Sequence, residues 1–345
     1  MATSSGTGNY PDVVQANDSN DAAVIATGHT VTLTGHVTGC NYFTIQSGAT
    51  LVGGGFSITV DNDSSDWSFF SDGTISAASA TDLIITNPNG VSKLNWNGQG
   101  GSIRNLTINN ANTIATLEDE NQTLLGDLTI EEGTLTTLDT DGSSSRNLTV
   151  AGEISIEDGG TLTGNASAIQ AANMEIHSGG TYNATSGTTT ITASSGGSTS
   201  GRAYWSHTGG TLRHNFGTFS VVSGAQVEPG GPANAGAGGM DAHSFWNLTS
   251  AGSLLPKTQR FVVCNDLETN GEIGYNGNSY WMEIYGTWTH KAGSTNNSDT
   301  GHSSRGYARV FNFEGGELDL EKMNMTFGSF RSTGNGVVKG GTNSG

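Results

Sequence analysis

The sequence of 345 residues predicts an all-β fold, a parallel β-helix (β-solenoid) with coils of roughly 20–26 residues. Three observations support this prediction. The composition is rich in Gly and poor in apolar residues, a short strand phrase recurs along the chain, and apolar and polar residues alternate strictly inside that phrase. Because crossovers between parallel strands strongly favour one hand, we expect a right-handed coil.

The composition excludes several other classes of protein. Apolar residues make up 33% of the chain and charged residues 13%, with 52 Gly and 5 Pro. The usual values are about 45–50% apolar and about 25% charged, so neither a wide globular core nor a highly charged disordered chain fits. Collagen is excluded because Pro is scarce and Gly follows no triplet period. A narrow core inside a repeating fold needs fewer apolar residues and fits the composition.

The recurring phrase opens with Asn or Asp and continues as apolar-x-apolar. Successive copies start about 20–26 residues apart, a period typical of a solenoid. The copies are Asp82-Leu-Ile-Ile85, Asn105-Leu-Thr-Ile108, Asp127-Leu-Thr-Ile130, Asn147-Leu-Thr-Val150 and Asn173-Met-Glu-Ile176, with weaker copies at Asn247, Asp266 and Asn324. A second phrase of the type Gly-Thr-Leu is interleaved with the first, at Gly133, Gly160, Gly180, Gly210 and Gly316.

Each phrase reads as a half-buried strand. In Leu106-Thr107-Ile108 the two apolar side chains face the core and Thr faces solvent. The same alternation predicts strands at 30–34, 56–60, 154–156, 188–192 and 219–221, and no segment shows the 3.6-residue apolar period of a helix. We expect the opening Asn and Asp residues to stack as ladders where the chain bends, and Gly to form the corners.

Departures from the repeat suggest three segments. Residues 1–28 lack the phrase and are predicted to be an N-terminal cap or docking arm, because the end of a solenoid exposes strand edges that need covering. Residues 29–200 are predicted to be regular acidic coils, and residues 201–345 aromatic-rich coils with long loop insertions. The predicted insertions are 195–202, 228–243 and 291–309.

Charge and apolar distribution limit the partners and the location. The chain has 13 Lys+Arg against 31 Asp+Glu, a net charge of −18, so it is not expected to bind nucleic acid, which needs cations that neutralise phosphates. No stretch approaches the roughly 18 consecutive apolar residues of a membrane span. Residues 1–10 show no basic region followed by an apolar one, so no secretory signal is expected. Cys40 and Cys264, far apart in sequence, are expected to be buried free thiols, with a disulfide as the alternative.

The phrases together resemble a known class of protein. The alternation of Asn-Leu-Thr-Ile with Gly-Gly-Thr-Leu, together with the stretches from Ser206 to Phe219 and from Phe245 to Ser250, resembles the β-helical virion structural proteins of tailed bacteriophages over roughly residues 80–330. The resemblance implies a non-enzymatic protein on the particle exterior, a capsid decoration or a fibre. It further implies assembly in the host cytoplasm, a homotrimer, contacts with the major capsid or tail proteins, and host surface glycan as a candidate ligand.

Two alternative functions remain open. The first is a tailspike depolymerase acting on host polysaccharide, which would need two carboxylates roughly 5–10 Å apart on one face. The adjacent acids Asp139/Asp141, Glu131/Glu132 and Glu157/Asp158 instead read as turn residues, so no catalytic residue is assigned. The second alternative is a secreted bacterial adhesin of the same fold.

No cofactor is predicted, with calcium as the alternative at two acidic segments. Asp61, Asp63 and Asp66, and likewise Asp139 and Asp141, place carboxylate oxygens at short intervals, as hard cations require. Neither segment completes a known calcium loop.

Late tryptophans provide candidate glycan contacts. Trp205, Trp246, Trp281 and Trp288 lie beyond residue 200. Aromatic rings stack on sugar rings, but they also fill a wider core, and the sequence favours the core.

Overall fold

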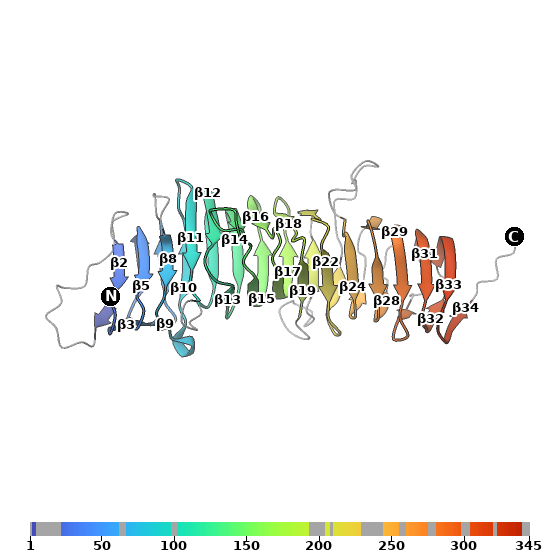
Figure 1. Cartoon of the computed structure of the whole chain (residues 1–345), viewed down its shortest axis with the longest axis horizontal. Helices are drawn as coiled ribbons and strands as arrows, with labels where there is room; N and C mark the ends of the chain where they lie inside the picture. Colours follow the sequence, from blue (N-terminus) through green and yellow to red (C-terminus); the bar gives the residue numbers. More distant parts are fainter. Residues whose placement is uncertain are drawn as a thin grey trace. The chain divides into compact units, whose positions relative to one another are not determined.

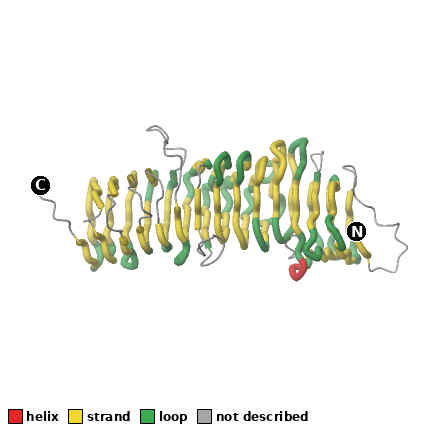
Figure 2. The backbone as a smooth tube through the Cα atoms, turned by 180° about the vertical axis from the view of Figure 1, so that it is seen from behind, coloured by secondary structure: helices red, strands yellow, loops and turns green. Residues whose placement is uncertain are grey.

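The structure, a computed structural model, describes residues 2–4, 22–61, 67–97, 103–192, 204–207, 210–228, 244–254, 260–274, 281–297, 304–319 and 323–339. The chain divides into two compact units, Met1–Ile169 and Gln170–Gly345. The described part of each unit is built from short strands joined by turns (Figure 1). The short 3-10 helix Ala77–Ser79 is the red segment in Figure 2. The all-β solenoid prediction is confirmed.

Most strands are short, and a few are long enough to turn a corner. In the first unit they are β1 (Ala2–Ser4), β2 (Ala22–Ile25), β3 (Thr30–Leu33), β4 (Val37–Cys40), β5 (Tyr42–Ile45), β6 (Thr50–Val52), β7 (Ser57–Val60), β8 (Trp67–Ser71), β9 (Thr74–Ile75), β10 (Asp82–Ile85), β11 (Val91–Asn95), β12 (Leu106–Leu117), β13 (Gln122–Leu124), β14 (Leu128–Thr136), β15 (Leu148–Ile156) and β16 (Gly160–Thr163).

The second unit continues the pattern. Its strands are β17 (Ile169–Ile176, starting just before the boundary), β18 (Thr181–Asn183), β19 (Thr188–Ile191), β20 (Tyr204–His207), β21 (Thr211–Arg213), β22 (Thr218–Val221), β23 (Gln226–Glu228), β24 (Asn247–Ser250), β25 (Ser253–Leu254), β26 (Arg260–Val263), β27 (Leu267–Thr269), β28 (Glu272–Gly274), β29 (Trp281–His290), β30 (Thr295–Asn297), β31 (Ser304–Phe313), β32 (Gly316–Asp319), β33 (Met323–Ser332) and β34 (Gly336–Lys339).

Parallel ladders join each coil to the next, and the recurring phrase sets the register in the first unit. Leu83 pairs with Leu106, and Leu106 pairs with Leu128, so the spacing between two phrases is the length of one coil here. All three leucines are fully buried. Like residues therefore stack on like inside a narrow core, as the phrase spacing predicts.

The next copy of the phrase does not continue that ladder. Leu128 pairs with Ile154, whereas Leu148 pairs with Gln122 on another side of the coil. Strand β15 is long enough to cross a corner, so its first half and its second half belong to different ladders. The prediction that the Asn147 phrase stacks on the Asp127 phrase is wrong, because the coil that begins at Leu128 is longer than the spacing between these two phrases and closes at Ile154.

The Asn and Asp residues that open the phrases bond to the following coil at the bends, although they do not stack on one another along the whole series as predicted, because the series breaks after Asp127. Asn105 Oδ1 accepts the backbone N–H of Asp127 at 2.7 Å, and Asp127 Oδ1 accepts that of Glu153 at 2.8 Å. In the second unit Asp266 Oδ1 accepts the N–H of Thr287 at 2.7 Å. Each side chain therefore satisfies a backbone donor of the following coil, where the strands separate.

A glycine precedes each of these backbone donors. A Cβ added to Gly126, Gly152 or Gly286 would lie 2.1, 2.0 or 2.5 Å from the ladder oxygen of the preceding coil. No real Cβ tolerates such a distance. Backbone carbonyl oxygens of the preceding coil lie close as well, 2.3 Å from the added Cβ at Gly286 and 2.8 Å at Gly152, so these corners leave no room for a Cβ.

Aromatic residues form part of the core of the second unit. A single ladder runs through Phe219, Leu248, Leu267, Trp288, Phe311 and Phe330. The first five members are buried, and Phe330 is 50% exposed. Trp288 meets Phe311 edge to face at 4.7 Å. Part of the late aromatic residues, Trp288 among them, therefore fill the core, whereas Phe216, Tyr285 and Phe330 are exposed.

The segments that depart from the repeat behave differently from one another. Strand β1 pairs antiparallel with β3, whereas β2, still within residues 1–28, already joins the parallel ladder through β5. The predicted insertion 195–202 and, after Glu228, the insertion 228–243 lie outside the described residues. The prediction that residues 291–309 form a simple insertion is wrong, because the segment contains β30 and the start of β31.

The two cysteines form no disulfide with each other. Cys40 is buried, as expected, whereas Cys264 is only half-buried. The prediction that both thiols are buried is therefore wrong for Cys264, which lies just past the end of β26 and outside the core ladder.

Candidate functional site

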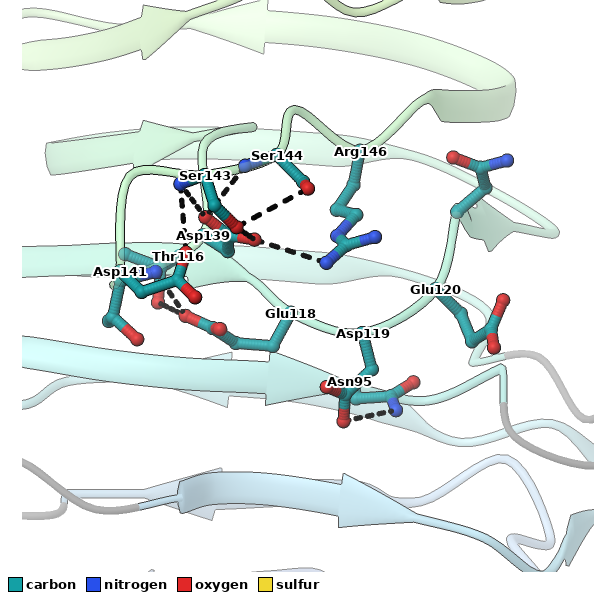
Figure 3. A network of polar contacts seen from close by, with 12 residues as sticks. Asn95, Thr116, Glu118, Asp119, Glu120, Asp139, Asp141, Ser143, Ser144 and Arg146 are labelled. Carbon is teal, nitrogen blue, oxygen red and sulfur yellow. Dashed lines mark hydrogen bonds and ion pairs between the residues drawn. The ribbon is translucent and has the colours of Figure 1, made fainter.

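Figure 3 shows an acid-rich corner of the first unit, where the chain leaves β12 and β14. Asp139 is 6% exposed, and its Oδ1 accepts the backbone N–H groups of Ser143 and Ser144 at 2.9 and 3.1 Å. Its Oδ2 forms an ion pair with Arg146 Nη2 at 3.1 Å. Hydrogen bonds from Ser143 lower the pKa of the exposed Asp141 carboxyl below its usual value. Both carboxylates thus act as acceptors that shape this loop.

Glu118 ties the same loop to the end of β12. Its Oε1 accepts the Thr116 hydroxyl at 2.8 Å and the backbone N–H of Thr140 at 2.9 Å, and the residue is 8% exposed. Nearby, Asn95 Nδ2 donates to Asp119 Oδ2 at 3.4 Å (Figure 3). The corner is a hydrogen-bonded network in which acidic side chains accept hydrogen bonds from backbone and side-chain donors of the loop.

The first acidic segment is only partly described. Asp61 follows β7, and its negative charge, together with burial as the larger cause, raises the pKa of the Cys40 thiol to about 12. Asp63 and Asp66 lie outside the described residues. Within the described ranges, no three His, Cys, Asp or Glu side chains gather closely enough to hold a metal ion. Calcium at either acidic segment stays a prediction.

The other adjacent acids sit on strand and turn surfaces. Glu131 and Glu132 are both exposed on β14. Glu157 Oε1 accepts the hydroxyl of Ser155 at 2.6 Å. The prediction of turn residues is therefore wrong for Glu131 and Glu132, which lie within β14, whereas Glu157 and Asp158 follow the end of β15.

The four tryptophans have different environments. Trp288 lies in the core, 0% exposed, with its indole N–H donating to Thr269 Oγ1 at 3.1 Å, so its prediction as a glycan contact is wrong. Trp205 and Trp281 lie on β20 and at the start of β29, and their side chains are outside the described part of the structure. Trp246 is half-buried beside a surface hollow, which makes it the remaining described candidate.

Trp246 belongs to an aromatic cluster in the second unit that the sequence did not reveal. His214 and Phe216, in the turn between β21 and β22, lie 5.5 and 4.9 Å from the Trp246 ring, centroid to centroid. The His214 and Phe216 rings meet edge to face at 5.4 Å. A hollow lined by His214 and Trp246, and not by Phe216, has a volume of about 10 Å³, room for roughly one water molecule.

Phe216 occupies an unfavourable position in two respects. It is 65% exposed, although burial of a Phe side chain contributes about 1.5–3 kcal/mol. Its φ of 58° is left-handed, which costs a residue with a Cβ roughly 1–2 kcal/mol. No sequence signal marks this conformation.

Comparison of the chain with protein-family models, with curated proteins and with solved structures finds no match. Among the described residues, no helix has the length and apolar character needed to cross a bilayer.

Proposed function

We propose that this chain is a non-enzymatic structural protein on the exterior of a tailed-phage particle, where it decorates the capsid or forms a fibre. The side-chain ladder carries the structural part of the proposal: Asn105, Asp127 and Asp266 each accept a backbone N–H from the following coil. Polar side chains that hold coils together are what a scaffold requires. The particle location rests on the likeness of the repeat phrases to β-helical virion proteins.

The proposal includes self-association, as a homotrimer, and contact with capsid or tail proteins. Phe330, Val337 and Val338 expose 50%, 55% and 42% of their surface on β33 and β34. Exposed apolar side chains on these two strands support an association surface there. Light scattering coupled to size-exclusion chromatography should give the mass of three chains, and a monomer would contradict the trimer.

Immunogold electron microscopy tests the location. Antibodies raised against the purified chain should label the outside of particles in a lysate of the host that carries the gene. Label on the surface of uninfected cells would instead support the adhesin alternative.

A second assay separates the structural role from the depolymerase alternative. Purified protein is incubated with host surface polysaccharide, and new reducing ends are measured. We expect none, and release of oligosaccharide would refute the non-enzymatic role.

A further inference from the structure

The turn between β10 and β11 in the first unit contains an asparagine followed directly by a glycine, Asn89-Gly90. Asn89 is exposed. Within the described part of the structure, neither its side-chain amide nor the Gly90 N–H forms a hydrogen bond. The coil ladders use neither group, so a carboxamide and a backbone nitrogen of adjacent residues stay available for reaction.

Hydrogen bonds on both sides fix this turn without engaging those two groups. Asn87 Oδ1 accepts the backbone N–H of Asn89 at 2.9 Å, and the Gly90 carbonyl oxygen accepts the N–H of Ile114 in the next coil at 2.9 Å. The Asn87 carbonyl oxygen accepts the Thr113 hydroxyl at 2.6 Å, and no bond from the Gly90 N–H closes the turn. The Gly90 nitrogen is therefore left without an acceptor beside the Asn89 side chain.

Gly90 also leaves the space around its nitrogen open. A glycine shields its backbone nitrogen less than any other residue because it has no Cβ. The φ of Gly90 is 135°, and even an added Cβ would meet no atom within 4 Å. Nothing in the packing therefore hinders a reaction between this nitrogen and the preceding side chain.

We infer that Asn89 is a site of spontaneous covalent modification, deamidation through a cyclic imide. The Gly90 backbone nitrogen loses its proton to hydroxide and attacks the side-chain carbonyl carbon Cγ of Asn89. A bond forms between Gly90 N and Cγ, the bond between Cγ and Nδ2 breaks, and Nδ2 takes up a proton and leaves as ammonia. Water then opens the imide at either carbonyl and gives aspartate or isoaspartate. Water is the only co-reactant, and no atom changes its oxidation state.

A second Asn-Gly pair, Asn270-Gly271 in the second unit, is packed differently although Asn270 is exposed as well. A Cβ added to Gly271 would lie 2.2 Å from the Gly252 carbonyl oxygen, so the preceding coil crowds this glycine. Asn270 Oδ1 lies 2.7 Å from the position of a Cβ on Gly293, in the following coil. The Asn270 side chain is thus held in the packing between coils. This pair is an internal control that shares the dipeptide and the exposure but not the open turn.

Either product changes the corner between β10 and β11. Aspartate adds a negative charge to a chain whose net charge is already −18. Isoaspartate also routes the main chain through the side chain of residue 89, which lengthens the turn by one backbone atom. That atom is inserted between the two hydrogen bonds that hold Asn89 to Asn87 and Gly90 to Ile114. The inference does not depend on the proposed structural role.

The test incubates the purified full-length chain at mildly alkaline pH in water enriched in heavy oxygen, and peptide mapping by mass spectrometry follows each asparagine. We expect the Asn89 peptide to gain heavy oxygen at least about tenfold faster than the Asn270 peptide, because folded packing protects Asn270. Isoaspartate should appear at residue 89. In denaturant the two peptides should react at similar rates, since the shared dipeptide alone then sets the rate.

One variant confirms the reacting side chain. Asn89→Gln keeps a carboxamide at this exposed position but would have to close a larger ring, so it should show no modification at residue 89 and an unchanged melting temperature. Equal rates at Asn89 and Asn270 in the folded chain would overturn the inference. A folded chain that stays unmodified at Asn89 while the denatured chain reacts there would overturn it too.

Discussion

Gly152 offers the sharpest test of the corner ladder. A Cβ at this position would lie 2.0 Å from Asp127 Oδ1 and 2.8 Å from the carbonyl oxygen of Gly126. That carboxylate oxygen accepts the backbone N–H of Glu153 at 2.8 Å. The substitution Gly152→Ala therefore has to displace the Asp127 side chain and break its bond to the next coil.

The expected cost has two parts. Loss of one hydrogen bond at an exposed corner contributes about 1 kcal/mol. Forcing a methyl group into occupied space adds about 1–3 kcal/mol, since the Gly126 carbonyl also has to move. We therefore expect Gly152→Ala to lower the free energy of unfolding by about 2–4 kcal/mol, and Asp127→Ala alone to lower it by about 1 kcal/mol.

The double variant tests the cause. Once Gly152→Ala has broken the hydrogen bond, removal of the Asp127 carboxylate costs nothing more and relieves the closest contact. The double variant should be at least as stable as Gly152→Ala alone. Urea unfolding followed by circular dichroism measures all three variants, and Ala151→Ser, at an exposed neighbouring position, is the matched control. Additive penalties, or a Gly152→Ala cost no larger than that of the control, would refute the reasoning.

Three further predictions concern buried groups. Burial lowers the pKa of His290 from 6.5 to about 4. Between these two pH values the imidazole is protonated in the unfolded chain and neutral in the folded chain. The free energy of unfolding should therefore fall by roughly 3 kcal/mol as the pH drops from about 6.5 to about 4. The urea midpoint of His290→Gln should lack this part of the decline. Equal declines in the wild type and the variant would contradict the prediction. Burial raises the pKa of the Cys40 thiol to about 12. A thiol reagent at pH 8 should therefore label only the half-buried Cys264 in the folded chain, and both thiols in denaturant. Rapid labelling of Cys40 in the folded chain would contradict its burial. Asp139→Ala should cost about 2–4 kcal/mol in urea unfolding, because two backbone donors and Arg146 lose their acceptor; Asp139→Asn keeps an acceptor oxygen and should cost less, so equal costs would refute this assignment.

The repeat phrases predicted strands well and register less well. Leu83, Leu106 and Leu128 stack as their spacing predicts, whereas Leu148 belongs to another ladder. An alternating strand looks the same on every side of a coil, so the phrase does not say which side it occupies. Register follows from the length of each coil, and corners such as the loop around Asp139 add residues that no periodicity reveals.

Burial of individual aromatics was harder to predict for a related reason. Trp246 and Trp288 are residues of the same type, yet one borders a surface hollow and the other is fully buried. Which face a side chain takes depends on the pairing of its strand. Trp288 is paired with Leu267 and Phe311, inside the core ladder, and Trp246 lies just before its strand begins.

Phe216 shows how the site differs from the rest of the solenoid. Among the described non-glycine residues with left-handed φ, Asp119 and Asn165 are of types that tolerate this conformation, and Phe216 is not. The next residue, Gly217, tolerates no side chain, because a Cβ there would lie 2.1 Å from the Thr185 carbonyl oxygen. Elsewhere composition, alternation and corner chemistry agree with the fold. Phe216 violates both its conformational and its burial preference, and the composition, alternation and corner chemistry that account for the other coils do not account for it.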